Sequence, residues 1–506
     1  MEKGFIQKYS TKIQGQISCF DRVVIKGTLH SVGHAGAVTN LLYRKDVMLK
    51  DFKSFIAPYR NALHQTAKQI AKQEGIEIEF IRNSRKVRKE DIVQRHLAQR
   101  TVETGLVCIL SAMERCQNYE YRYNKSNGQS YLQMTSGKCL HYYYYFIDPS
   151  FGLCYLRVPT WCPFRLQFYF NGHNWLANEL KKAGVDFTLE DNAFTYLADY
   201  EKAQAICDGF QVKRLHDCLD TYTARFCPVA AQLCHSGYHW SIMQAEYATD
   251  IVFKDERTVG KIYDDLLNTL MHSVQPDDVA KFLGRKRLHG KNNLELETTT
   301  KQVRHQMRRI KHRMGACSIK MYDKFSKVLR IETTTNNPSE FYHYRSVEHR
   351  DGTKTSKVAP VKKNIYSLKA LSTIMGHCNQ RYLKYIAAFD QPTMGKKRLQ
   401  KMSSKTKVND RTYKGFNFFD KDDEHILKTI ASGDFVLNGF RNKHLKEKIP
   451  NKSTGQISRI IKRLRVKGLI KRAGKSYKYF ITTLGMKIIA TALNFKELLI
   501  QKRLSY

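Results

Sequence analysis

The sequence predicts an α/β (α+β) body of more than one domain with antiparallel hairpins, followed by a smaller C-terminal domain of helices and one hairpin. Three observations support this prediction. The chain has 506 residues, which is about three times the length of an ordinary domain. Its residues are 42% hydrophobic and 11% aromatic, which suffices for folded cores. Its apolar residues follow the helical period in some segments and the two-residue period of strands in others.

Residues 1–120 are predicted to form an N-terminal α/β region. Apolar residues at helical spacing end before Gly75, and alternating residues then indicate a half-buried strand. The predicted elements are, in order, a helix over 51–73, a strand over 76–81, a basic helix over 88–100 and a buried strand over 105–112.

Residues 121–395 are predicted to form a mixed α+β body with an aromatic-rich sheet and an intensely basic segment at 281–330. The turn signal Asp148-Pro149-Ser150 separates two of its strands. The predicted elements are strands over 141–147, 153–158 and 165–170, a helix from 172 to about 184, helices over 201–274 with an interruption at 234–253, a hairpin over 317–323 and 328–335, and a helix over 367–389.

The C-terminal segment 421–506 carries the clearest pattern. It follows a predicted solvated basic linker at 396–420, which is rich in Lys, Ser and Thr. Its predicted elements are helices over 422–432, 440–449 and 455–467, two strands over 469–472 and 477–481 around a turn, and a closing helix from 483. Two helices, a recognition helix and a β-wing follow one another in the order of a winged helix-turn-helix.

The charge of the chain predicts a polyanionic partner. Lys and Arg number 86 against 46 Asp and Glu, a net charge of +40 that is spread along the whole length. Nucleic acid is the commonest partner for such an excess, and a membrane surface or a merely basic enzyme is the alternative. No apolar run reaches the length of a membrane span, and the N-terminus lacks a secretory signal layout. We therefore expect no membrane partner and a cytoplasmic, nucleoid-associated protein, with its 12 scattered cysteines reduced.

The predicted winged helix has the chemistry of a duplex DNA reader. Residues 421–506 hold 20 Lys and Arg against six Asp and Glu, a net charge of +14. A recognition helix meets base edges in the major groove, while wing cations bind phosphates. A winged helix used for protein contact is the alternative. The predicted DNA-binding residues are Gln456, Ser458, Arg459, Lys462, Arg463, Lys471, Arg472, Lys475 and Lys478.

Two phrases of this segment resemble MarR-like winged-helix proteins, namely Gly468-Leu469-Ile470 before the wing and Thr483-Leu484-Gly485 after it. The resemblance covers about a sixth of the chain. It implies a homodimer, but members of that family are much smaller, so the long N-terminal region departs from their pattern. The whole chain also resembles uncharacterised bacterial proteins labelled as MarR-type regulators, notably over 19–27 and 158–165, and this resemblance brings no established activity.

The hairpin Ser318–Lys324 with Leu329–Thr333 is similar to the Tyr-Asp-Lys … Leu-Arg-x-Glu pairing of rolling-circle replication initiators. The resemblance implies a metal-dependent DNA nuclease or strand transferase with Tyr322, Asp323 and Glu332 as catalytic residues. A carboxylate holds Mg²⁺, and a tyrosine attacks a phosphodiester to form a covalent intermediate. The His-x-His metal motif of better-known nicking enzymes is absent from this chain. An ordinary amphipathic hairpin with a cross-strand ion pair is the alternative.

Three further groups are weaker candidates. The acids Asp21, Asp148, Glu246 and Asp250 offer metal ligands, and a helix would place Glu246 and Asp250 on one face. Zinc-capable atoms occur at Cys227, Cys234, His235 and His239, but at no standard spacing, so no metal is assigned. A group of aromatic residues is expected either to stack unpaired bases beside Arg157, Arg165 and His173 or to form the core of a sheet. The members of this group are Tyr142–Phe146, Trp161, Phe164, Phe168, Tyr169, Phe170 and Trp175.

The sequence as a whole favours a nucleic-acid-binding protein of a bacterial mobile element. The winged helix would select a site on duplex DNA, and the basic body would hold strands and, with a catalytic site, cut or join them. The predicted nucleic-acid-binding residues of the body are Arg285, Lys286, Arg287, Arg304, Arg308, Arg309, Lys311 and Arg313. The alternatives are a non-enzymatic MarR-like transcriptional regulator and a structured-RNA-binding protein that forms a ribonucleoprotein.

Overall fold

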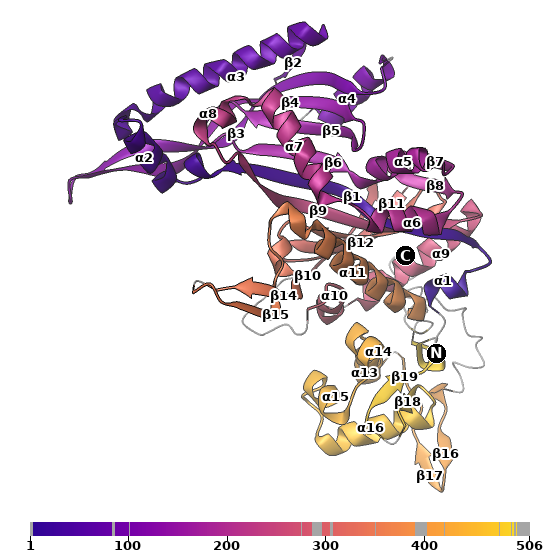
Figure 1. Ribbon diagram of the computed structural model, residues 1–506. Coiled ribbons are helices and arrows are strands. Elements are labelled where there is room, and N and C mark those ends of the chain that lie inside the picture. The colour runs from indigo at the N-terminus through magenta and orange to yellow at the C-terminus, as the bar shows by residue number, and fades with distance from the viewer. Residues whose placement is uncertain are drawn as a thin grey trace, which may run out of the picture. The chain divides into compact units, whose positions relative to one another are not determined.

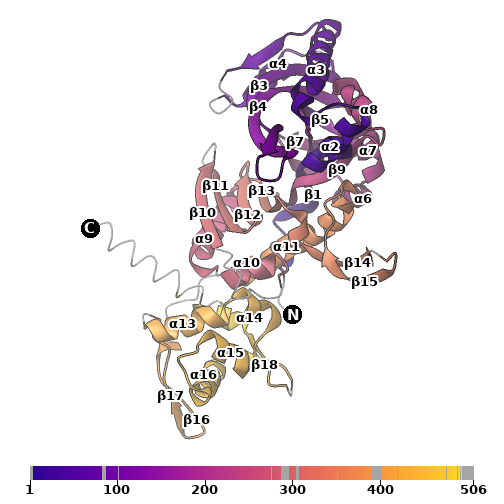
Figure 2. The same ribbon diagram turned by 90° about the vertical axis from the view of Figure 1, so that its left-hand side faces the viewer.

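The chain folds into two compact units in the computed structural model, which describes residues 4–82, 87–100, 102–274, 276–285, 296–303, 307–349, 351–389, 402–418, 420–474, 476–486, 488–489 and 492. Unit 1 comprises Met1–Ile17, Ala248–Thr334 and Ile374–Tyr506, and unit 2 comprises Ser18–Tyr247 and Thr335–Thr373. Both units combine helices with mostly antiparallel strands (Figures 1 and 2), which agrees with the predicted α+β class.

Unit 2 is built on a sheet in the order β1-β6-β5-β4-β3-β2, antiparallel except for the parallel pair β2 and β3. Its elements are β1 (Ile13–Leu29, which begins in unit 1), α2 (Ala35–Arg44), α3 (Phe52–Glu74), β2 (Ile78–Ile81), α4 (Lys89–Ala98), β3 (Gly105–Asn124), β4 (Gln129–Asp148), β5 (Gly152–Pro159), β6 (Leu166–Asn171), α5 (Gly172–Lys182), β7 (Phe187–Glu190), β8 (Ala193–Leu197), α6 (Tyr200–Asp208), α7 (Val212–Phe226), α8 (Val229–Leu233), β9 (Tyr238–Phe253, which ends in unit 1), β14 (Tyr342–Glu348), β15 (Lys354–Pro360) and α11 (Leu368–Phe389, which ends in unit 1).

The tyrosine run of β4 explains why helices cover both faces of this sheet. Successive side chains of a strand point to opposite faces. Tyr144 stacks on Phe226 of α7 with ring centroids 4.3 Å apart. Tyr143 and Tyr145 point the other way and join the buried cluster that contains Ile92 of α4. The continuous aromatic segment of β4 therefore contributes side chains to the hydrophobic cores on both faces of the sheet.

Unit 1 contains a second set of strands in the order β10-β11-β12-β13-β9. Its elements are α1 (Phe5–Lys8), α9 (Glu256–Ser273), α10 (Pro276–Phe282), β10 (Leu296–Val303), β11 (Met307–Met314), β12 (Cys317–Lys324), β13 (Val328–Thr335), β16 (Thr406–Val408), β17 (Arg411–Tyr413), α13 (Lys421–Ile430), α14 (Gly433–Asn438), α15 (Asn442–Lys448), α16 (Thr454–Val466), β18 (Ile470–Arg472) and β19 (Tyr479–Ile481).

One face of β11 and β12 is apolar and packs on helices of unit 1. Ile310 pairs with Met321 across the two strands, and both side chains are fully buried. The Tyr263 hydroxyl of α9 donates a hydrogen bond to the Met321 carbonyl over 3.2 Å. His312 lies 3.2 Å from the Tyr382 hydroxyl of α11, and burial lowers its pKa to about 4. This neutral histidine is a core residue.

The C-terminal elements pack around a small core of their own. Ile457, Ile461 and Leu464 of α16 are buried, and helix α15 packs against both α16 and α13 (Figure 2). A capping box begins α16, because the Ser453 amide donates to the Gln456 side chain and the Gln456 amide donates back to the Ser453 hydroxyl. The hairpin β18–β19 follows the helix directly.

The structure differs from the sequence-based expectations in four places. Strand β3 continues without a break through residue 120, where a domain boundary was expected. Residues 238–253 form the long strand β9, where only an interruption between helices was expected. The expected linker contains the hairpin β16–β17, while its residues 396–401 and 419 lie outside the described part. Helix α14 begins at Gly433, where only the end of the preceding helix was expected.

In the described part of the chain, no helix has the length and apolar character needed to cross a membrane. The twelve cysteines, all within the described residues, are free thiols.

Candidate functional site

The opposite face of the unit 1 strands is polar and rich in cations. Arg309, Lys311 and Arg313 alternate along β11 with its buried apolar residues, so they share the second face of the strand. The register of β12 places Tyr322 beside Arg309 and Lys320 beside Lys311. This polar face, defined by these five residues together with Arg330, Glu332 and Asp250, is the first candidate site.

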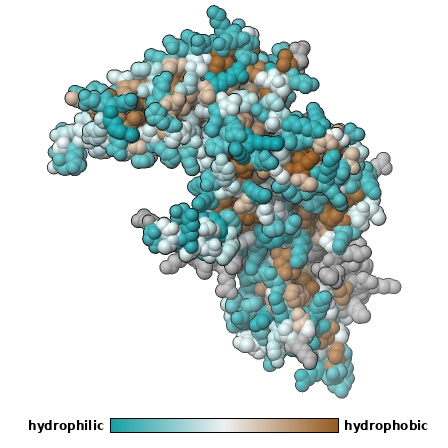
Figure 3. Space-filling model, viewed as in Figure 1, coloured by the Kyte–Doolittle hydropathy of each residue, from teal (hydrophilic) through white to brown (hydrophobic). Residues whose placement is uncertain are grey.

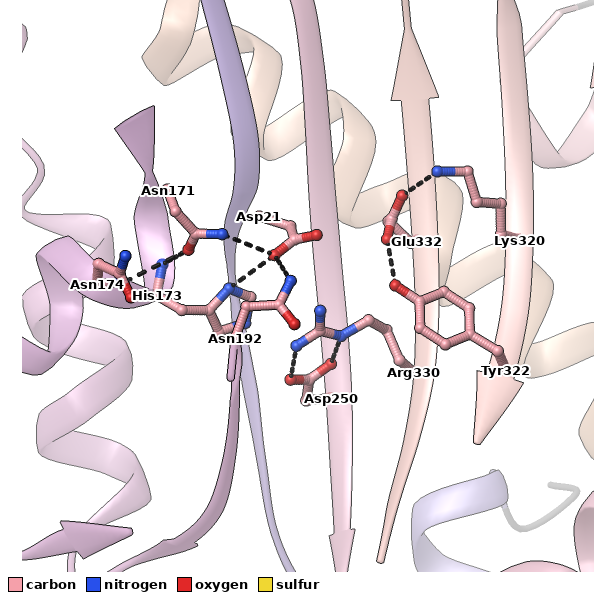
Figure 4. Close-up of polar contacts among 10 residues, drawn as sticks. All are labelled: Asp21, Asn171, His173, Asn174, Asn192, Asp250, Lys320, Tyr322, Arg330 and Glu332. Atoms are coloured by element: carbon pink, nitrogen blue, oxygen red, sulfur yellow. Dashed lines mark hydrogen bonds and ion pairs between the residues drawn. The ribbon is translucent and has the colours of Figure 1, made fainter. Parts of the chain in front are cut away.

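Glu332 of β13 is the centre of the polar face (Figure 4). The Tyr322 hydroxyl donates a hydrogen bond to one carboxylate oxygen of Glu332 over 2.5 Å, and the Lys320 ammonium lies 2.5 Å from the other. The Thr334 hydroxyl donates to that second oxygen over 3.3 Å. The Glu332 side chain is only 1% exposed, so a phenol and an ammonium replace water around a buried carboxylate.

Arg330 and Asp250 form a buried ion pair on the same face (Figure 4). The Arg330 Nε and Nη2 atoms each donate to one carboxylate oxygen of Asp250 over 2.6 Å, which is the bidentate geometry of a strong pair. Both side chains are 0% exposed. The guanidinium carbon lies 6.0 Å from the centroid of the Tyr322 ring, so the pair also brings positive charge near the phenol.

The structure brings together two of the three expected catalytic residues. Tyr322 and Glu332 are in contact, whereas the next residue, Asp323, points to the other face of β12 because successive strand side chains alternate. We therefore remove Asp323 from the candidate site. Lys320 was not expected at this site, because only the pairing of β12 with β13 places its ammonium beside the Glu332 carboxylate.

The polar face does not fit the expected Mg²⁺. Magnesium is held by carboxylates that are open to it. Glu332 is in contact with the Lys320 ammonium, and both oxygens of Asp250 accept from Arg330. Since the two carboxylates already have cationic partners, we assign no metal-dependent step to this face.

The other basic residues expected in the body have mixed placements. Arg313 is exposed, and Arg309 and Lys311 are half-buried on the polar face. Arg285 donates to the Met314 carbonyl over 3.4 Å, so it ties the end of β11 to the residues after α10. The Arg308 side chain and all of Lys286, Arg287 and Arg304 lie outside the described residues.

Unit 2 holds a separate buried carboxylate, Asp21 of β1, with three polar partners (Figure 4). The Asn171 and Asn192 amides donate to the same Asp21 oxygen over 3.3 and 2.5 Å, and His173 Nδ1 lies 3.2 Å from it. Gly172 allows this approach, because a β-carbon there would lie 2.1 Å from the Phe20 carbonyl oxygen. Asp21 thus links β1 to the start of α5 through hydrogen bonds.

The remaining acidic candidates divide by their surroundings. Asp148 caps the turn after β4, because it accepts from the amides of Ser150 and Phe151 over 2.8 Å each. Glu246 and Asp250 lie in the strand β9 rather than in the expected helix. Within unit 2, the Asp21 and Glu246 carboxylate oxygens lie within 4.8 Å of each other.

The expected zinc ligands do not converge within the described residues. No group of three or more metal-capable side chains there includes Cys227, Cys234, His235 or His239. Burial is the main cause that raises the pKa of Cys227 to about 12, and its sulfur lies 3.6 Å from the Tyr238 hydroxyl. Most residues of the aromatic cluster are buried in the core, which was one of the two alternatives expected for them. Trp161 and Tyr169 are only half-buried.

Helix α16 presents the second candidate surface. Gln456, Ser458, Arg459 and Lys462 are exposed, as is Arg465. The Asn442 amide of α15 donates to the Ser458 hydroxyl over 2.7 Å and so fixes one helix on the other. Figure 3 shows mostly hydrophilic residues over α15 and α16. The exposed face of α16 is therefore cationic, opposite its apolar buried face.

Arg463 does not belong to this surface. Its guanidinium donates to both carboxylate oxygens of Asp423 over 2.7 Å, and also to the carbonyls of Lys414 and Gly415. The guanidinium carbon stacks 3.8 Å from the centroid of the Phe416 ring. These contacts use its donors inside the protein, so we remove Arg463 from the expected DNA-binding residues.

The hairpin after α16 keeps most of its expected cations at the surface. Lys471 and Arg472 are exposed, and Lys478 is half-buried with its ammonium 5.5 Å from the centroid of the Phe480 ring. Lys475 lies outside the described residues.

The resemblances to MarR-like proteins and to replication initiators rest on the sequence motifs alone. Comparison of the chain with protein-family models, with curated proteins and with solved structures found no match.

Proposed function

We propose that this protein binds double-stranded DNA through its C-terminal region, and that this region is a winged helix-turn-helix. The order α13, α15, α16 and β18–β19 supports the proposal, because it is the order of elements in that fold. In this assignment α16 is the recognition helix and β18–β19 is the wing.

The observation that carries the proposal is the division of α16 into two faces. Its apolar side chains are buried, and its outer face offers Arg459, Lys462 and Arg465 with the polar Gln456 and Ser458 at the N-terminal end. The N-terminal residues of a recognition helix are those that reach base edges. Arg and Gln side chains make specific contacts there, and cations farther along the helix and in the wing bind phosphates.

We expect Arg459→Ala and Lys462→Ala to weaken binding of duplex DNA by about tenfold each at near-physiological salt, because each removes one contact to a base or phosphate. Fluorescence anisotropy of a labelled duplex with the full chain measures the effect. Arg44→Ala, an exposed arginine of α2 in unit 2, is the matched control and should bind as the wild type does. Equal affinity of all three variants and the wild type would contradict the proposal.

A second function, strand cleavage, is favoured by the contact between Tyr322 and Glu332. The Tyr322 oxygen would attack a backbone phosphorus while its proton passes to the Glu332 oxygen 2.5 Å away. The bond from that phosphorus to one sugar oxygen would break, so that a tyrosine phosphodiester forms and the released sugar hydroxyl takes a proton from Glu332 or from solvent. The cations Arg309, Lys311 and Arg313 on the same face would bind the flanking phosphates. Duplex binding together with strand cleavage would fit a protein of a bacterial mobile element.

We expect Tyr322→Phe to lower nicking of supercoiled plasmid by about a thousandfold or more, because the nucleophile is lost while the ring remains. Agarose gels with Mg²⁺ present and with Mg²⁺ chelated measure the nicked fraction. Tyr344→Phe, a 71% exposed tyrosine of β14, is the control and should nick normally. Nicking that survives in Tyr322→Phe removes this residue as the nucleophile.

The two alternative functions predict other outcomes of the same experiments. A transcriptional regulator binds duplex DNA but produces no nicked plasmid in the wild type. A ribonucleoprotein component purifies with RNA, which shows as a high ratio of absorbance at 260 nm to that at 280 nm.

A further inference from the structure

Unit 2 carries two adjoining hollows with a common wall of Cys116 and Trp161. The smaller has a volume of about 200 Å³ and is lined by Lys26, Arg115, Arg157 and Arg165. The larger has a volume of about 410 Å³ and is lined by Lys53, Arg60 and Lys138. Among the described residues that line them there is no Asp or Glu. We call the two hollows together the Trp161 groove.

The charge of the Trp161 groove is largely uncompensated. Arg157 is the exception, because it donates to Glu114 over 3.1 Å, and that carboxylate also accepts from Lys89 and Tyr143. Within the described residues, the other six lining cations have no ion pair with a carboxylate. Burial lowers the pKa of Lys26, and the positive charges of Arg165 and Lys363 lower it further. A cation whose charged form is disfavoured by its neighbours gains most from a bound anion.

Two arginines of the smaller hollow also have hydrogen-bonding capacity left. The Nε atoms of Arg157 and Arg165 are buried and have no partner in the described structure. The Arg165 Nη2 atom is fixed, because it donates to the Gly33 carbonyl over 2.9 Å. A buried donor without a partner is unfavourable.

Trp161 stands where the two hollows meet. Its indole nitrogen donates to the Asn118 side chain over 2.6 Å, which fixes the plane of the ring. The Arg60 guanidinium carbon lies 5.9 Å from the ring centroid, and the ring itself is half-buried. A fixed, partly open indole between two groups of cations has the layout of a stacking platform for a base whose flanking phosphates lie on either side.

We propose that the Trp161 groove binds single-stranded nucleic acid, with an unpaired base against Trp161 and the adjacent phosphates on the cations of the two hollows. A duplex does not suit this groove, because its bases are already stacked on one another and cannot meet the indole face. The site lies in unit 2 and uses none of the residues proposed for duplex binding in the C-terminal region, so it stands independently of that proposal.

Tryptophan fluorescence of the full-length protein tests the proposal. The chain has three tryptophans, and Trp175 and Trp240 are only 8% and 3% exposed, so a quencher that stacks on an indole reports Trp161. We expect an oligothymidylate of about 16 nucleotides to quench the fluorescence on binding. A matched oligouridylate shows whether the groove prefers DNA or RNA.

Charge reversal identifies the groove as the place of binding. Arg60→Glu and Arg115→Glu should each raise the oligothymidylate concentration at half-maximal quenching by about tenfold, because each turns an attraction for phosphate into a repulsion. Lys72→Glu is the matched control, because Lys72 is an exposed cation of α3 that does not line the groove, and it should behave as the wild type does. Both arginine side chains are exposed, so these changes preserve the fold.

The contrary outcomes are equally specific. No quenching of the wild type, or the same half-maximal concentration in Arg60→Glu, Arg115→Glu and Lys72→Glu, overturns the proposal. Quenching by polyglutamate with the same response to charge reversal would assign the groove to an acidic polypeptide instead. Arg459→Ala should leave the quenching unchanged, so failure of the duplex-binding proposal and failure of this one give different results.

Discussion

Replacing Asp250 by Ala should destabilise unit 1 by about 3–5 kcal/mol, because the variant leaves the Arg330 guanidinium buried without its counter-ion. Both side chains are fully buried, and the pair has two hydrogen bonds of 2.6 Å. Thermal denaturation and the hydrogen exchange of the β9 and β13 amides measure the loss.

Two further variants separate the charge effect from a packing effect. Arg313→Ala removes an exposed cation from the same polar face and should change stability by less than about 0.5 kcal/mol. The double variant Asp250→Ala with Arg330→Met removes both charges and should be more stable than Asp250→Ala alone, because the buried guanidinium that lost its bidentate carboxylate is also removed. If Asp250→Ala has the same thermal stability as the wild type, other contacts of Arg330 compensate for the lost carboxylate, and the ion pair does not stabilise the packing of β9 and β13.

The sequence predicted best those elements that have one apolar and one polar face. Helix α3 and the hairpin β12–β13 were expected within one or two residues of their observed bounds, because burial of one face imposes a clear period. The outer parts of β3 and β4 were not expected. Their side chains between residues 113 and 140 are mostly exposed or half-buried, so hydrogen bonding between the strands rather than burial defines them, and no apolar alternation marks them.

The candidate sites show the same limit at the level of single residues. The alternation of β13 placed Glu332 and Arg330 on one face, but only the pairing of strands showed that Lys320 and Tyr322 share one carboxylate. Trp161, Arg157 and Arg165 were among the residues expected to stack unpaired bases, but the second hollow of the Trp161 groove, with Arg60, was not expected. Arg60 and Trp161 are 101 residues apart in the chain, and no sequence motif links them.

Arg463 was expected to contact DNA, but it is engaged inside the protein, as is its neighbour Lys467. The segment expected to be a linker has few apolar side chains, but its backbone carbonyl groups accept hydrogen bonds from cations of and just after α16. The Lys467 ammonium donates to the Ser404 carbonyl and the Thr406 hydroxyl over 2.5 Å each, and Arg463 reaches the carbonyls of Lys414 and Gly415. Backbone acceptors have no signature in a sequence, so net charge overstates the charge offered to a ligand.

Arg463→Ala should therefore destabilise the C-terminal region by about 3 kcal/mol rather than remove a contact to DNA. The variant loses the bidentate pair with Asp423, two hydrogen bonds to carbonyls and the stacking on Phe416, and it leaves a carboxylate that is 8% exposed without its partner. Hydrogen exchange measures the effect, and we expect the amides of α13 and α16 to exchange faster while those in the strands of unit 2 do not change.

Arg459→Ala on the exposed face of α16 is the matched comparison for this effect. It should keep the hydrogen exchange of α16 at the wild-type rate while it weakens duplex binding, because its side chain makes no contact that holds the helix in the described structure. Arg463→Ala should show the reverse order of effects, in which lost protection precedes any lost binding as temperature rises. Unchanged protection in Arg463→Ala together with weakened binding would return Arg463 to the DNA-contacting surface and would mean that its contacts with Asp423 and Phe416 open when DNA is bound.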